Sequence, residues 1–158
     1  MTSSAEDPRR GPIRRALGDL PRHGARLWWI RQVATELLAL RCVEDAVEKL
    51  KAEESDLLEG PDSDGRAEAL IQIIKERMEP KRTTPEVRAL WMVLDLDRQA
   101  IGTTAKERRT RAGREFRGKN GTPVRHSQLR QHYERRALDW LTGDLLAYDD
   151  AHVARHDG

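Results

Sequence analysis

The 158-residue chain has little cysteine and few apolar residues, and each shortage excludes a class of protein. Cys42 is its only cysteine, so an intramolecular disulfide is impossible and a reducing compartment fits. Hydrophobic residues make up 37% of the chain, and no run approaches the ~20 apolar residues of a membrane span. Residues 1–15 contain no apolar stretch like that of a secretory signal. The sequence therefore predicts a cytoplasmic protein without membrane contact, built as one domain or two small ones.

Strand and catalytic patterns are also missing. Alternating Val, Ile and Thr segments bounded by turns do not occur, and neither does a Walker or Gly-x-Ser-x-Gly motif. Cys42 lies near the apolar stripe of a predicted helix, where most cysteines are packing residues. His152 and His156 are four residues apart, but zinc sites need three or four ligands from a rigid frame. We expect an all-α protein that is not an enzyme and binds no metal or cofactor.

The N-terminal part of the chain divides at about residue 25. Residues 1–25 are rich in Pro, Gly, Ser and Arg, which predicts a disordered basic tail, either a solvated leader or a nucleic-acid-binding arm. Apolar residues then recur every three or four positions, which predicts one long helix over 27–54. This stripe consists of Ile30, Val33, Leu37, Leu40, Val43, Val47 and Leu50. We expect residues 26–80 to form a helical scaffold that self-associates, with a homodimer through residues 27–50.

Two adjacent tryptophans stand at the start of this predicted helix. Neighbouring residues on a helix diverge by about 100°, so Trp28 and Trp29 cannot both face one core. One of them is expected to pack under the tail or against a partner, because a tryptophan contributes a large apolar surface. The pair is therefore the predicted partner surface.

Further helices are indicated by their caps. A helix is predicted over 66–79, and Thr84 followed by Pro85 predicts the start of another, because proline suits the first helical position. Thr104 and Glu107 have the form of a capping box, which predicts a helix ended by Gly118. A last helix is predicted over 123–148, followed by a frayed tail at 149–158. The expected fold is all-α with about five helices.

Positive charge is concentrated between residues 98 and 136, where twelve Lys and Arg residues against three Glu give a net charge of +9. The whole chain carries only +2, so the remaining residues sum to −7. Such segregation suggests a surface for an anionic partner, and nucleic acid is the commonest one. The rival explanation is that the acidic segment 32–97 packs against the basic one, within the molecule or across a dimer.

The basic segment has the order of a helix-turn-helix reader, with a basic capped helix, a turn and a helix with a polar face. Residues 84–148 are therefore predicted to form a basic helix-turn-helix-like module, although its turn is longer than three or four residues. The residues expected to face the DNA groove are Arg125, Gln128, Gln131, His132 and Arg135. Those expected to contact phosphates are Arg108, Arg111, Arg114, Arg117 and Lys119.

Three stretches of the same region also carry a resemblance. They are ALWMVLDLD at 89–97, TTAKERRTRAG at 103–113 and LRQHYERRALDWLTGDLL at 129–146. Together, residues 85–146 resemble a short helical module of actinobacterial proteins that accompanies regulatory, signalling or NTPase domains. The resemblance implies a helix-turn-helix-like module without catalysis.

Two functions of different classes follow from these features. The first is a non-enzymatic DNA-binding regulator whose dimer supplies two half-sites. The alternative is a protein–protein adaptor in a bacterial signalling or defence system. In that case the apolar stripe of residues 27–50, with Trp28 and Trp29, would capture a partner helix, and the Arg-rich half would dock an acidic protein surface.

Overall fold

The computed structural model describes residues 7–53, 62–98, 103–116 and 124–157, and within these ranges it contains helices and no strand. The all-α prediction is confirmed, but the chain has more and shorter helices than the five expected. The α-helices are α1 (Arg10–Asp19), α2 (Leu27–Val33), α3 (Thr35–Leu38), α4 (Arg41–Glu53), α5 (Asp62–Met78), α6 (Pro85–Leu94), α7 (Ala105–Glu115), α8 (His126–Gln128) and α9 (Arg135–Asp157). Two 3₁₀ turns, η1 (Leu20–Arg22) and η3 (Glu79–Lys81), and a π-helical turn, η4 (Leu129–Glu134), connect them.

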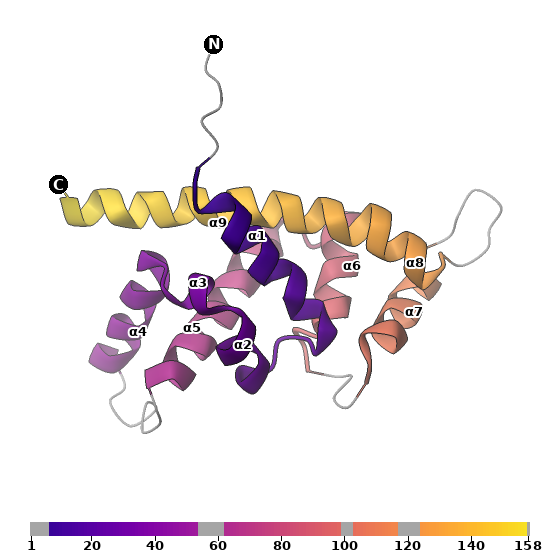
Figure 1. Ribbon diagram of the computed structural model, residues 1–158, viewed down its shortest axis with the longest axis horizontal. Helices are drawn as coiled ribbons and strands as arrows, with labels where there is room; N and C mark the ends of the chain where they lie inside the picture. Colours follow the sequence, from indigo (N-terminus) through magenta and orange to yellow (C-terminus); the bar gives the residue numbers. More distant parts are fainter. Residues whose placement is uncertain (1–6, 54–61, 99–102, 117–123, 158) are drawn as a thin grey trace, which may run out of the picture.

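The C-terminal segments α8, η4 and α9 form one long rod that runs the length of the molecule (Figure 1). Helices α1, α4, α5 and α6 pack against α9. The predicted frayed tail at 149–158 is wrong, because α9 continues to Asp157 and its last turns have tertiary partners. The Asp149 carboxylate is 2% exposed and accepts hydrogen bonds from the Cys42 backbone amide at 2.8 Å and from Arg9 at 2.9 Å. None of the described helices combines the length and apolar character that a membrane span requires.

The predicted disordered tail is wrong for residues 7–25, while residues 1–6 lie outside the described part of the chain. Helix α1 and the turn η1 that follows it bury Ile13, Leu17 and Leu20 against the core, each at 2% exposure or less. These residues are spaced by four and three, the period of one helix face, and Pro12 falls in the first turn, where its missing N–H is not needed. The high Pro, Gly and Arg content conceals this pattern.

Truncating Leu17 is expected to show that α1 belongs to the core. Leu17→Ala removes a side chain that is 0% exposed and should lower the free energy of unfolding by about 2–5 kcal/mol. The matched control is Arg15→Ala on the exposed side of the same helix, which should change it by less than about 0.5 kcal/mol. Both values come from urea denaturation followed by circular dichroism. Equal effects of the two variants would show that α1 is not part of the folded core.

The single helix predicted over 27–54 is divided into α2, α3 and α4. Ala34 has φ −113° and ψ 33°, outside the helical region, and the chain turns again between α3 and α4. The predicted apolar stripe is used within the protein's own core, where Ile30, Leu37 and Val43 are each 0% exposed. The described side chains of this stripe therefore give the homodimer through residues 27–50 little support, and that dimer stays a prediction.

The buried residues form a main core and a small second cluster. The second cluster joins Ala89 and Val93 of α6 to Ala112 of α7 and to Val124 and Leu129. The opposite side of α6, including Leu90 and Leu94, belongs to the main core. Helix α6 therefore connects the C-terminal module to the rest of the protein through two buried faces.

The capping predictions have mixed outcomes. The Thr104 hydroxyl oxygen accepts a hydrogen bond from the Glu107 amide at 3.1 Å, as a capping box requires. Helix α6 begins at Pro85 as predicted, but the Thr84 hydroxyl donates to the Lys81 carbonyl instead of capping it. Helix α7 ends at Glu115, and Gly118 lies outside the described residues.

The connection between α7 and α8 spans residues 116–125, longer than the turn of a tight helix-turn-helix. It returns to α7 where the Val124 amide donates to the Gly113 carbonyl at 3.0 Å. A Cβ at Gly113 would collide with the Val124 carbonyl oxygen, so only glycine allows this approach.

Candidate functional site

Six exposed cations gather on α7 and on the first half of the C-terminal rod, and we call this region the basic end. They are Lys106, Arg111, Arg114, Arg125, Arg130 and Arg135. None of them forms an ion pair with any residue that the structure describes. Helices α7 and α8 contact each other and lie at the end of the molecule opposite α4 and the C-terminus (Figure 1). Six cations without ion pairs to described residues therefore lie at one end of the molecule.

Many arginines elsewhere in the molecule do have acidic partners. Arg14 is 2.7 Å from Asp139, and Arg77 is 2.6 Å from Asp144. Like charges gathered without counter-ions repel one another and destabilise the compact state. The six cations of the basic end therefore gain no stabilisation from ion pairs among the described residues, and an anionic partner would relieve their repulsion.

A buried ion pair holds the two parts of the basic end together. The Arg109 guanidinium donates to both carboxylate oxygens of Glu134, at 2.6 and 2.9 Å. The Arg109 side chain is 14% exposed and that of Glu134 only 2%. Such bidentate pairs fix orientation as well as distance. This pair sets the position of α7 relative to η4, and with it the spacing of the exposed cations.

Arg108 is corrected from a phosphate contact to a structural residue. Its side chain is 2% exposed, and its guanidinium donates to the backbone carbonyls of Val93 at 2.6 Å, Thr103 at 2.7 Å and Pro21. Burial lowers its pKa from the ordinary arginine value. The cause is its place on the inward stripe of α7, four residues before the buried Ala112.

The remaining predicted phosphate contacts divide into two groups. Arg111 and Arg114 are exposed on α7, as that role requires. Arg117 and Lys119 lie outside the described residues. Arg130 is a further exposed cation beside them that the sequence interpretation did not assign.

The five residues predicted to face the groove are all exposed: Arg125, Gln128, Gln131, His132 and Arg135. The backbone that carries them is not a regular α-helix, because η4 is a π-helical turn from Leu129 to Glu134. Such turns widen the helix locally and are frequent at functional sites. Side chains in this segment therefore do not follow the α-helical spacing of 100° per residue on which the groove-facing set was predicted. The groove-facing role stays a prediction.

The two tryptophans of the predicted partner surface behave differently. Trp29 is 9% exposed, and its indole N–H donates to the Asp19 carbonyl at 2.9 Å, so it is a core residue and its assignment to a partner surface is corrected. Trp28 is 46% exposed, and its ring lies 4.9 Å from that of His23. The difference follows from their divergence on α2 and from the packing of η1 against Trp29.

Of the two histidines four residues apart, His152 makes a structural contact. His152 Nδ1 lies 2.8 Å from the Asp45 carboxylate, and the Tyr148 ring packs against the imidazole at 4.7 Å. The side chain of His156 is outside the described part of the chain. No cluster of three or more potential metal ligands occurs among the described residues.

Cys42 is expected to be unreactive in the folded protein. Burial, with the Asp149 carboxylate nearby, raises the pKa of its thiol from 9.0 to about 12. At about pH 8 the thiol stays protonated, so iodoacetamide should label it only after unfolding in guanidinium. The raised pKa also means that its stabilising contribution is complete below about pH 9 and is lost as the pH rises toward about 12. Rapid labelling of the native protein, measured by mass spectrometry, would contradict this assignment.

Comparisons with known protein families, with characterised proteins and with solved structures find no match to this chain. The resemblance of residues 85–146 to the actinobacterial helical module therefore stays a prediction. The function must be argued from the residues of the basic end themselves.

Proposed function

We propose that this chain is a non-enzymatic DNA-binding protein that contacts its partner through the basic end. The observation that carries the proposal is the group of six exposed cations without acidic partners among the described residues. Lys and Arg neutralise phosphates and supply most of the affinity of non-specific DNA binding. Lys106, Arg111, Arg114 and Arg130 are assigned to phosphates in this proposal.

Sequence preference would come from the first half of the C-terminal rod. Arg125 and Arg135 can pair with guanine edges, and Gln128 and Gln131 with adenine edges. Helix α6, α7 and the rod pack around the second cluster, so this segment sits on a fixed three-helix support. The connection before α8 is longer than in a tight helix-turn-helix. We therefore assign DNA binding to the surface of the basic end and do not assign that motif.

The rival explanation, in which the acidic segment covers the basic one, holds for α6, which packs against α7 and η4, but few ion pairs join the two segments among the described residues. Contacts between the two segments include Arg88 with Glu115 at 2.6 Å, Arg98 with Glu68 at 3.6 Å and Arg136 with Glu86 at 4.0 Å. The acidic helices α4 and α5 lie away from α7 and α8 in Figure 1. The six cations of the basic end stay outside these contacts.

The second candidate function is a protein–protein adaptor, and exposed Trp28 is the observation in its favour. The apolar stripe of residues 27–50 does not contribute to this alternative, because its described side chains are mostly buried in the protein's own core. An adaptor would therefore depend on Trp28 and the neighbouring His23. Trp28→Ala should abolish capture of the partner if this alternative is correct, and it should leave DNA affinity unchanged.

The proposal is tested by fluorescence-anisotropy titration of the protein with duplex DNA of random sequence at about 50 and 200 mM salt. Each neutralised phosphate contributes about −0.9 to the slope of log K against log salt, so the four assigned contacts predict a loss of about 10² in affinity over this range. Micromolar binding that collapses at the higher salt supports the proposal. Failure to bind at the lower salt would contradict it and favour the adaptor.

A further inference from the structure

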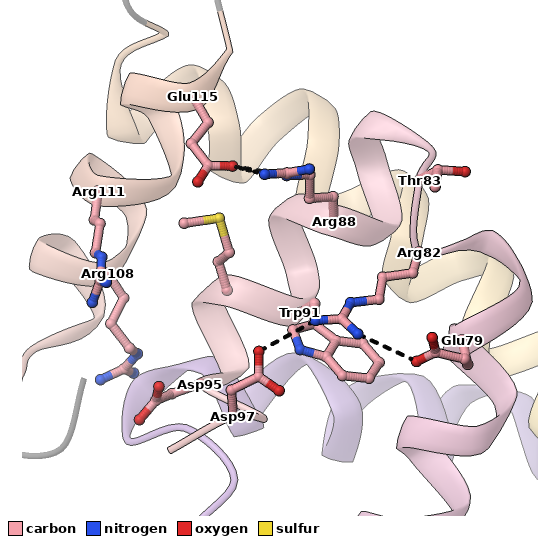
Figure 2. Close-up of a pocket in the computed structure, with 11 residues that line it drawn as sticks. Glu79, Arg82, Thr83, Arg88, Trp91, Asp95, Asp97, Arg108, Arg111 and Glu115 are labelled. Atoms are coloured by element: carbon pink, nitrogen blue, oxygen red, sulfur yellow. Dashed lines mark hydrogen bonds and ion pairs between the residues drawn. The ribbon is translucent and has the colours of Figure 1, made fainter. Parts of the chain in front are cut away.

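A cleft of about 490 Å³ lies between η3, α6 and α7. Its lining includes Arg82 and Thr83 before α6, Arg88 and Trp91 on α6, and Arg111 and Glu115 on α7 (Figure 2). This volume lies within the range of small-molecule sites. The cleft is thus large enough for a ligand the size of a nucleotide.

Trp91 gives this cleft an unsatisfied donor. The side chain is 5% exposed, and its Nε1–H has no hydrogen-bond acceptor among the described residues. By contrast, the buried indole of Trp29 does have an acceptor, the Asp19 carbonyl. An unpaired buried N–H in a native structure requires an explanation, and a missing ligand is one.

Arg82 covers the indole of Trp91 and is loosely held. Its guanidinium lies 4.4 Å from the ring centroid, and Figure 2 shows it extended across the indole. Its carboxylate partners are Asp97 at 3.4 Å and Glu79 at 3.6 Å, and all three side chains are about half exposed. Exposed pairs at such distances contribute little to stability and exchange readily. Arg82 can therefore shift, which gives a ligand access to Nε1.

The donors define the chemistry of the ligand. Indole N–H and guanidinium groups only donate, so only an acceptor satisfies Trp91. A cationic ligand would pair with Asp97 or Glu115 but would leave the Trp91 N–H unpaired. An oxyanion would replace the exposed carboxylates now held by Arg82, and it would also accept from Trp91. Guanidinium groups bind phosphate in bidentate geometry, so a phosphate group suits the Arg82 guanidinium, which lies over the Trp91 ring.

We propose that the cleft between α6 and α7 binds a small organic phosphate, whose oxyanion contacts Arg82 and the Nε1–H of Trp91. This site does not depend on the proposed DNA-binding function, because Arg82, Arg88 and Trp91 lie outside the basic end. It shares only Arg111 with that surface.

Isothermal titration calorimetry with ADP, pyrophosphate, citrate and adenosine tests the proposal. ADP and pyrophosphate should bind, citrate should bind at least about tenfold more weakly, and adenosine should not bind. Arg82→Gln should weaken ADP binding about tenfold or more. Trp91→Phe, which keeps a ring and removes the N–H, should weaken it about fivefold. The matched control Arg136→Gln, which removes an exposed charge outside the cleft, should change it less than about twofold.

Three outcomes would overturn the assignment. The first is no binding of ADP or pyrophosphate at concentrations up to about 10 mM. The second is unchanged ADP affinity in Arg82→Gln, which is an exposed substitution that should not affect folding. The third is citrate binding as tight as that of pyrophosphate, which would make the cleft a carboxylate site.

The two proposals can fail independently. Arg114→Gln combined with Arg130→Gln should weaken DNA binding and leave ADP affinity unchanged, because both residues lie outside the cleft. ADP binding without DNA binding would overturn only the proposed function, and DNA binding without ADP binding would overturn only the cleft assignment.

Discussion

Arg109→Met is expected to lower the free energy of unfolding by about 3–5 kcal/mol, because breaking a buried ion pair leaves a charge without compensation. The residue left behind is Glu134, whose side chain is 2% exposed and whose two carboxylate oxygens both accept from Arg109. The measurement is guanidinium denaturation of the variant and the wild type, followed by circular dichroism. Loss of the pair should also weaken DNA binding, since it positions α7 relative to η4.

The double variant Arg109→Met with Glu134→Met distinguishes the effect of the ion pair from the effect of losing each side chain. It should regain much of the lost stability, because neither charge remains buried, and the cycle then gives a coupling energy. Arg136→Met is the exposed control, since its contact with Glu86 is 4.0 Å long and its side chain is 72% exposed. It should change stability by less than about 1 kcal/mol. If Arg109→Met lowers the free energy of unfolding no more than this control does, the pair does not have the structural role assigned to it.

Neutralising four cations of the basic end together is expected to lower duplex DNA affinity about a thousandfold or more at low salt. The variant combines substitution to glutamine at the four residues assigned to phosphates, Lys106, Arg111, Arg114 and Arg130. Four phosphate contacts would be lost, so the slope of log K against log salt should decrease in magnitude by about 3.6. Since all four side chains are exposed, the fold should be unaffected. Anisotropy titration at several salt concentrations measures both quantities.

The control for this variant removes the same charge from other parts of the surface. It carries glutamine in place of Arg15, Lys49, Lys81 and Arg155, which are all exposed. If the basic end is the binding surface, the control should keep most of the affinity and nearly the full salt slope. If DNA responds only to the total charge of the protein, the two variants will lose affinity equally, and the assignment of the surface is wrong.

Local sequence patterns predict those features of the fold that depend on neighbouring residues, such as the starts of helices. Thr84 and Pro85 mark the start of α6, and Thr104 caps α7 through the Glu107 amide. The spacing from Ile30 to Val47 correctly predicts helix, but it does not predict the division into α2, α3 and α4. That division depends on packing against the rest of the core, for which the local sequence carries no clear signal.

Long-range contacts explain the two largest errors in the fold. The order of α1 depends on burial of Leu17 against distant helices, and composition concealed a spacing that would have indicated it. The ordered end of α9 depends on Asp149, which receives hydrogen bonds from residues more than one hundred positions earlier in the chain, namely Arg9 and Cys42. No local pattern could reveal those partners.

The candidate site was predicted in part for similar reasons. Exposed arginines on α7 follow from its charge pattern, and the place of Arg108 between Ala105 and Ala112 on the apolar stripe indicates that it faces inward. Glu134 as the partner of Arg109 could not be inferred, because 25 residues separate them. The cleft at Trp91 likewise depends on the packing of α6 against α7.

Arginine modification by phenylglyoxal, with and without duplex DNA and mapped by mass spectrometry, tests the central claim most directly. The reagent modifies exposed guanidinium groups, so Arg108 should stay unmodified in both conditions. DNA is predicted to protect Arg111, Arg114, Arg125 and Arg130 while leaving Arg15 and Arg155 unchanged. Protection confined to Arg15 and Arg155, or equal modification of all six arginines with and without saturating DNA, would contradict binding through the basic end.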